Sequence, residues 1–293
     1  RYSYEEKQFT LTQFVNSSLV NGPLAQSDDW DAWTPKLGLD YFYNDDIMLY
    51  FSASRGFKSG AFNSSNTFEP AVNPEFIDAY EIGAKSMLFE DRMRLNISAF
   101  NYHYTDLQVQ GIEQNSLTVT LQNAAEAKIN GIEIDLSALP SAHSKIDLGV
   151  SWLEAEYSDF ETLDQFGSPI NLRGKMLPNA PEITVNLGVQ QSMDIAQKFN
   201  VMVRVDYYYS AEKFFNEFND TIKARQEAYN LVNARIRIEP FEKENWAFSI
   251  YGKNLTDELV LANTLAIPSL FGDGYIAPLN PPRTYGVEFE VTF

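Results

Sequence analysis

The sequence predicts an all-β fold, a portion of a transmembrane antiparallel β-barrel. Three observations predict this fold. Apolar and polar residues alternate with a period of two along about twelve segments, as they do in strands with one apolar face. The connections between these segments are alternately short and long, as in outer-membrane barrels. Aromatic residues make up 14% of a chain whose mean hydropathy is −0.28, which fits an aromatic girdle around a wet lumen.

The expected strands follow one another along the whole chain. The clearest is "TYGVEFEVTF" (284–293), in which aromatic and Val residues alternate with Gly, Glu and Thr, and "FNVMVRVDYYY" (199–209) repeats the pattern. A tilted strand that crosses a bilayer needs roughly 9–11 residues, and most of these segments have that length. In chain order, the expected strands are residues 1–7, 34–43, 47–57, 76–88, 92–110, 117–138, 145–157, 182–193, 199–210, 227–238, 246–255 and 284–293.

The connections fall into two classes that alternate along the chain. The short connections are residues 44–46, 89–91, 140–144, 194–198 and 240–245. The long connections are residues 8–33, 58–75, 158–181, 211–226 and 256–283, with a shorter one near 111–116. A soluble sandwich has no reason to sort its loops by end, whereas an outer-membrane barrel has short periplasmic turns and long extracellular loops. The strand at 1–7 then runs outward and Phe293 ends in the periplasm.

Composition excludes several other classes of function. The formal net charge of −18 argues against a nucleic-acid partner, which requires a basic surface, and against a helix that docks on anionic lipid. There is no cysteine, and His103 and His143 lie far apart, so no disulfide, metal site or cofactor is expected. No catalytic triad, phosphate loop or zinc spacing appears, and Glu133 and Asp135 merely share one strand face. We therefore expect no enzyme. The sequence contains no apolar run of about 20 residues, so no transmembrane helix is predicted. The opening "RYSYEEKQF" is not a signal peptide.

Two segments leave their local structure open. The segment "EFIDAYEIGAKSML" (75–88) places Phe76, Tyr80 and Ala84 at helical spacing, so a helix fits it as well as a strand does. Residues 117–138 change phase near Gly131, which indicates either a bulge or a bend above the membrane.

Four segments together resemble the TonB-dependent receptor family. They are "YFSASRGFKSGAFN" (50–63), "NPEFIDAYEIGAKSMLFEDRMRLNISAFNYHYTDLQVQ" (73–110), "NAAEAKINGIEID" (123–135) and "NLTDE" (254–258), which precedes the terminal aromatic strand. The resemblance favours a strand at 75–88. It implies a 22-stranded barrel around an N-terminal plug, of which residues 1–293 are the C-terminal part with about the last twelve strands, the plug and first strands being absent. It also implies coupling to the TonB-ExbB-ExbD complex, although no segment here matches the family's TonB-contacting stretch.

The expected function is that of a receptor in the outer membrane of a Gram-negative bacterium, importing a scarce solute. By the resemblance this solute is a ferric siderophore, with glycan fragments or a corrinoid as alternatives. A passive porin or channel and a secreted adhesion or lectin module are the other classes considered. Outer-membrane lipid and lipopolysaccharide are the expected surroundings.

Candidate functional residues lie mainly in the long connections. Trp30, Trp33, Phe271 and Tyr275 are aromatic loop residues that can stack on a ligand, or else pack the loops or an interfacial girdle. Arg55 and Lys58 can attract an anionic chelate, or Arg55 can reach lipid phosphates.

Two further sets are predicted from the strand faces. Tyr285, Phe289 and Phe293 are candidates for an assembly signal on the last strand, whose terminal aromatic resembles what the outer-membrane insertion machinery recognises. We also expect acidic side chains in the lumen to meet basic partners. The acids are Glu81, Glu133, Asp135, Asp206, Glu288 and Glu290, and the available bases are Lys85, Arg92, Arg94, Arg204, Arg235 and Arg237.

Overall fold

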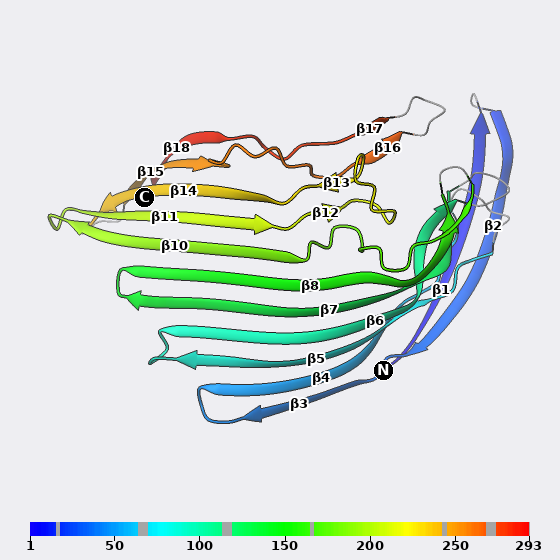
Figure 1. Ribbon diagram of the computed structural model, residues 1–293, viewed down its shortest axis with the longest axis horizontal. Coiled ribbons are helices and arrows are strands. Elements are labelled where there is room, and N and C mark those ends of the chain that lie inside the picture. The colour runs from blue at the N-terminus through cyan, green and yellow to red at the C-terminus, as the bar shows by residue number, and fades with distance from the viewer. Residues whose placement is uncertain are drawn as a thin grey trace.

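A computed structural model describes residues 1–15, 18–63, 70–112, 119–164, 167–241, 245–267 and 274–292. One 12-stranded antiparallel sheet contains most of these residues, and its strands follow the order of the sequence (Figure 1). The strands are β3 (Lys36–Phe42), β4 (Ile47–Lys58), β5 (Glu75–Leu88), β6 (Met93–Ile112), β7 (Val119–Ser141), β8 (Ser144–Leu163), β10 (Ile183–Ile195), β11 (Phe199–Ser210), β14 (Tyr229–Pro240), β15 (Trp246–Lys253) and β18 (Thr284–Val291), with β9 (Pro169–Asn171) paired to β8. Among the described residues, no helix is long and apolar enough to span a membrane.

Three two-stranded pairs stand apart from the main sheet. They are β1 (Tyr2–Val15) with β2 (Ser18–Trp33), β12 (Lys213–Phe214) with β13 (Arg225–Gln226), and β16 (Leu265–Ile267) with β17 (Gly274–Ile276). All three lie at the end of the sheet opposite the tight turns, on the right in Figure 1. The predicted sorting of short turns to one end and long connections to the other is therefore confirmed.

The two faces of the sheet differ in chemistry, as the alternation predicts. On one face, a single row of cross-strand neighbours is apolar: Phe51, Ile82, Ala99, Ile132, Trp152 and Ile183. Its larger side chains are well exposed, for example Ile82 at 61% and Ile132 at 44%. The row one residue away on the other face is mainly polar: Tyr50, Gly83, Ser98, Glu133, Ser151 and Thr184. A sheet that exposes such an apolar face is suited to contact with lipid, whereas its polar face suits a wet interior. We call these the outer and inner faces.

Charged residues end the apolar zone of the outer face toward the loops. Four residues further along each strand from the apolar row, the direct cross-strand neighbours are Arg55, Asp78, His103, Lys128 and Glu156. Four residues correspond to roughly 13 Å along a strand. The outer-face row between these two already carries Asn101, Asn130 and Glu154. Because polar and charged side chains are costly in hydrocarbon, the lipid-facing zone ends before the charged row.

The expectation for residues 1–33 was wrong. Residues 1–7 were expected to cross the membrane and residues 8–33 to form a loop. Instead, β1 and β2 pair only with each other, from Tyr2 opposite Trp33 to Val15 opposite Ser18, and this hairpin projects from the loop end. The alternation of residues 1–7 was real, but a period-two pattern does not identify the partner strand. The polar segment 21–31 contains Gly22 and Pro23, which are typical of turns and hid the second strand.

Both open alternatives are resolved by the structure. Residues 75–88 form β5, a regular strand between β4 and β6. The phase change in β7 is a bulge between Asn123 and Ala125, next to a bulge in β6 after Tyr104, where Asp106 takes a positive φ of 54°. On the other side of β7, strand β8 bulges at Ser158, opposite Glu126 and Ala127. Gly131 itself keeps regular register, opposite Phe100 of β6. The ring of Phe100 lies across this glycine, and a Cβ at position 131 would come within 2.3 Å of the ring.

A small hydrophobic core lies beyond the charged row, at the loop end. It consists of buried Ala125, Ala127, Tyr157, Phe160 and Leu172, with Phe218 from a neighbouring loop packed against it. The outer ends of β6, β7 and β8 therefore continue above the lipid-facing zone as a packed structure. This core positions the loops around the inner face.

Candidate functional site

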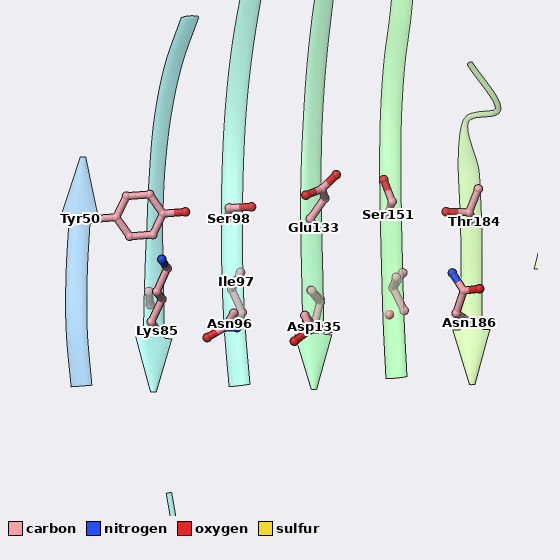
Figure 2. Close-up of a pocket in the computed structure, with 14 residues that line it drawn as sticks. Tyr50, Lys85, Asn96, Ile97, Ser98, Glu133, Asp135, Ser151, Thr184 and Asn186 are labelled. Carbon is pink, nitrogen blue, oxygen red and sulfur yellow. The ribbon is translucent and has the colours of Figure 1, made fainter. Parts of the chain in front are cut away.

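The candidate site is the inner face of the sheet together with the loops at its outer end. At mid-height a shallow depression of about 260 Å³ opens on this face. Figure 2 shows two rows of side chains that line it, one containing Tyr50, Ser98, Glu133, Ser151 and Thr184, the other Lys85, Asn96, Asp135 and Asn186. Gly83 completes the first row and Gly149 the second, so that each row consists of direct cross-strand neighbours. Register alone therefore brings these residues together from β4, β5, β6, β7, β8 and β10.

Tyr50 forms one wall of the depression and depends on a glycine. Its ring extends from β4 along the row toward Ser98 (Figure 2). It crosses Gly83 of β5, where a Cβ would lie 2.6 Å from the ring. The phenol donates a hydrogen bond to a carboxylate oxygen of Glu81, and the ammonium of Lys85 lies 5.4 Å from the ring centre. Sequence reasoning singled out Glu81 and Lys85 but missed Tyr50, although Gly83 in "YEIGAK" was a signal for it.

Ion pairs cover the inner face on either side of the depression. Arg94 lies 3.5 Å from Asp135, and Arg204 lies 2.7 Å from Asp206. Further along the sheet Arg235 pairs with Glu288, and Arg237 pairs with Glu290 at 2.9 Å. These four pairs confirm the expected match with bases for Asp135, Asp206, Glu288 and Glu290, whereas Glu81 accepts a hydrogen bond from Tyr50. Arg92 differs, because it donates instead to the carbonyls of Leu139 and Pro140 at the turn end.

Several tyrosines lie on the same face. Tyr102 and Tyr104 on β6 and Tyr157 on β8 lie between the depression and the loops. Tyr208 on β11 and Tyr229 on β14 lie further along the sheet, in the same two cross-strand rows as the depression. The rings of Tyr208 and Tyr229 are 5.8 Å apart. Burial raises the pKa of the Tyr157 phenol, which stays a neutral hydrogen-bonding group. Rings with a polar edge can contact a flat or conjugated ligand through both stacking and hydrogen bonds.

The two loop tryptophans occupy different environments. Trp30 is 7% exposed and packs on Gly60, where a Cβ would come within 2.2 Å of the indole. Lys7 strengthens this contact, since its ammonium bonds Ser59 and the Gly60 carbonyl and lies 5.7 Å from the indole centre. Trp33 is 70% exposed and contacts Tyr2 at 5.3 Å, on the opposite face of the hairpin. The structure thus does not bring Trp30 and Trp33 to one surface.

Arg55 and Lys58 also lie on opposite faces of β4. Arg55, in the charged row of the outer face, is 3.8 Å from Asp78 and stacks on the ring of Phe76 at 4.6 Å. Lys58, on the inner side, pairs with Glu75 at 3.3 Å. Each base therefore has its own acidic neighbour, and the two do not form a common cationic patch.

The remaining candidates lie near the C-terminus. Tyr275 is 47% exposed on the short β16–β17 hairpin, while Phe271 lies outside the described residues. Tyr285 and Phe289 are 71% and 65% exposed on the outer face of β18, and Phe293 lies outside the described residues. Within the described part of the chain, no group of His, Cys, Asp and Glu side chains could hold a metal ion.

Comparison with known proteins gives one family and several similar structures. A family described as TonB dependent receptor-like, beta-barrel matches residues 1–255. The ferric yersiniabactin uptake receptor FyuA from Yersinia pestis aligns with a TM-score of 0.80 and 20% identity over 100% of this chain and 42% of that one. The siderophore receptor PiuA from Acinetobacter baumannii aligns with a TM-score of 0.75 and 17% identity over 98% and 39%. The ferric preacinetobactin receptor BauA from the same species gives 0.67 and 17% over 92% and 37%. This chain spans about two-fifths of the length of these proteins, with which it shares the fold.

Proposed function

Because the chain belongs to the TonB-dependent receptor β-barrel family, we propose that it forms the binding wall of an outer-membrane receptor that imports a ferric siderophore by TonB-coupled transport. This is a family of receptors and not of enzymes. The observation that carries the proposal is the division of the sheet into an apolar outer face and a polar, tyrosine-rich inner face. Such a wall is built to stand between lipid and a solute pathway.

The chemistry of the inner face supports a chelate as the solute. The tyrosine rings beneath the loops offer surfaces for the conjugated groups that bind iron, and their hydroxyls can bond the oxygen atoms of those groups. Loop residues add to this surface in the proposal: Tyr275 is exposed, and Phe271 belongs to the same connection. Arg55 lies on the outer face and Trp33 is exposed on the hairpin, and both would contact the lipid headgroup and lipopolysaccharide layer. Trp30 and Lys58 would hold the loops in place.

The complete protein extends the proposal beyond this chain. Residues 1–293 would be the C-terminal part of a 22-stranded barrel, because the family's barrels close their edges and β3 and β18 each have one unpaired edge here. The TonB-ExbB-ExbD complex would supply the energy for transport from the inner membrane. The inner-face ion pairs would contact a plug inside the barrel.

Uptake of radioactive iron tests the proposal. A strain lacking the gene, and the same strain carrying it, would be supplied with ⁵⁵Fe bound to a panel of catecholate, hydroxamate and carboxylate chelators. We expect the gene to restore uptake of one chelate class, and deletion of tonB to abolish that uptake. Equal uptake without TonB would indicate a passive channel. Unchanged iron uptake with impaired use of a glycan or a corrinoid would assign a different solute.

A further inference from the structure

Four asparagine side chains near the loop end bond the backbone in the same reciprocal way. In each, the amide oxygen accepts the N–H of one residue while the amide nitrogen donates to the carbonyl of that same residue. Asn63 pairs with Leu121 (2.6 and 3.1 Å), and Asn123 with Asn73 (2.7 and 2.9 Å). Asn219 pairs with Met176 (2.7 and 2.9 Å), and Asn254 with Glu258 (3.0 and 2.9 Å). We call these pairs amide latches.

A latch imitates a rung of a sheet. Two residues that face each other in an antiparallel ladder also exchange one N–H and one carbonyl. A latch therefore satisfies both backbone polar groups of a residue on a side where no strand pairs with it, and it demands a primary amide, because a carboxylate lacks the donor. Asn63 and Asn254 are 5% and 7% exposed, so the groups they satisfy would otherwise be left with little access to water.

Two latches join the same pair of segments in opposite directions. Asn63 reaches from the β4–β5 connection to β7, and Asn123 reaches from β7 back to that connection. Between them, Ala61 and Val72 form a bridge that holds the two halves of the connection together. The connection is thus fixed to β7 at both of its described ends.

Gln108 of β6 adds a third attachment. Its side chain is 9% exposed and donates to the carbonyls of Ser59 and Asn73, both at 2.9 Å. Its backbone N–H donates to Glu75 at 2.8 Å, the carboxylate that also pairs with Lys58. At the bulge in β6, the carbonyl of Asp106 accepts a second hydrogen bond from the side-chain amide of Asn123 at 2.7 Å. Three of the family-like sequence segments therefore meet at one place.

We propose that residues 59–63 and 70–74 of the β4–β5 connection and the outer ends of β6 and β7 form one rigid unit, with Asn63, Asn123 and Gln108 as positioning residues for ligand binding. These two stretches of the connection move together with β6 and β7 and not independently of them. The role in ligand binding rests on the proposed function. The coupling of the three segments does not, and it can be tested without any ligand.

Amide hydrogen exchange of the full-length protein in detergent micelles provides that test. Asn123→Asp keeps the shape of the side chain but places an oxygen against the carbonyls of Asn73 and Asp106. We expect exchange at 59–63 and 70–74, and also at 105–110, to become about tenfold faster, since tenfold corresponds to the loss of one or two hydrogen bonds. Asn63→Asp should do the same, and the double variant should add little, because one unit is released only once.

The control is Asn263→Asp, which adds the same charge in an exposed loop. Asn263 uses only its oxygen, which accepts the N–H of Thr264, and aspartate keeps that oxygen. Exchange at 59–63 and 70–74 should be unchanged in this variant, and exchange in β10 and β11 should be unchanged in all variants. Acceleration at 59–63 and 70–74 alone, with 105–110 still protected, would overturn the single unit. Exchange rates that stay unchanged in both Asn123→Asp and Gln108→Leu would also overturn the single unit. Absence of iron uptake, by contrast, would count only against the proposed function.

Discussion

At the scale of single residues, contacts between large side chains and glycines shape the inner face. Phe100 lies over Gly131, Tyr50 over Gly83 and Tyr251 over Gly286. In each case the ring lies flat across the neighbouring strand and occupies the space that a Cβ would take. These contacts keep bulky rings out of the interior and so leave room there for a solute.

Replacing one of these glycines should therefore destabilise the sheet. Gly131→Ala would place a methyl group 2.3 Å from the Phe100 ring, and we expect a loss of about 1–3 kcal/mol, typical of overpacking. Gly149→Ala, on the same face, meets only the Cβ of Asn186 at 3.9 Å and should be close to neutral. Urea unfolding of the full-length protein in bilayers measures both. Adding Phe100→Ala should remove most of the penalty of Gly131→Ala, and an undiminished penalty would show that the ring is not its cause.

A half-buried carboxyl in the loops, that of Glu217, should make their stability depend on pH. Burial raises the pKa of Glu217 above 4.5, so folding disfavours its charged form. A raised carboxyl pKa costs nothing below the unfolded value and destabilises the loop increasingly as pH rises through the folded value. Glu217→Gln should therefore protect residues 211–226 from proteolysis at pH 7 to 8. The protection should disappear near pH 4, and a benefit that is equal at both pH values would exclude ionisation as its origin.

At the scale of elements, the β1–β2 hairpin is the least expected part of the structure. It is held to the β4–β5 connection by Trp30 over Gly60, by Lys7, and by stacking of Phe9 on Phe62 at 5.9 Å. These contacts hold the hairpin to the β4–β5 connection at one place along its length.

Trp30→Ala should release the β1–β2 hairpin from the β4–β5 connection without unfolding the barrel. The substitution leaves a cavity worth about 3–5 kcal/mol at a packed site, whereas Trp33→Ala removes a ring that is 70% exposed and should cost little. Protease cleavage within residues 1–33 should increase strongly in the first variant and hardly at all in the second. Similar cleavage of both would show that burial of Trp30 does not anchor the hairpin.

Strand positions and faces could be predicted from the sequence because period-two alternation directly reports which face is apolar. Strand partners at the loop end could not. Residues 21–31 combine turn-forming and acidic residues, so β2 gave no apolar signal, and residues 1–7 were assigned to the wrong sheet. The amide latches could not be predicted either. Asn63 and Asn123 bond backbone groups, which are the same at every position, so the sequence does not identify their partners. Tyr50 was missed because its role depends on a glycine on another strand.

At the scale of the whole molecule, the opposed faces determine how the protein sits in the membrane. The apolar zone of the outer face ends before the charged row of Arg55, Asp78, His103, Lys128 and Glu156. Beyond this row, β6, β7 and β8 continue into a loop structure with its own small core. The lipid-facing zone and the loop structure are thus stabilised by different surroundings.

Adjacent residues of β10 should respond oppositely to a new charge. Leu187 lies on the outer face between Leu148 and Tyr207, and Asn186 lines the depression of the inner face. Leu187→Arg should cost on the order of 2–4 kcal/mol in bilayers, while Asn186→Arg should be mild beside Glu133 and Asp135. Folded protein can be measured by its mobility on unheated gels from isolated outer membranes. Equal losses in both variants would show that the inner and outer faces are wrongly assigned.

Apart from the short β9, the described strands of the main sheet lie side by side in the order in which they occur along the chain, from β3 to β18. A sheet with this connectivity can be assembled one hairpin at a time, since each new strand finds its partner across a single connection and pays only the entropy of closing that connection. The hairpin is therefore also the unit in which such a sheet can change size during evolution. Duplicating β10 and β11 would insert two strands whose inner and outer faces are already in phase with their neighbours. The circumference of the barrel would grow while the register of every other strand was preserved.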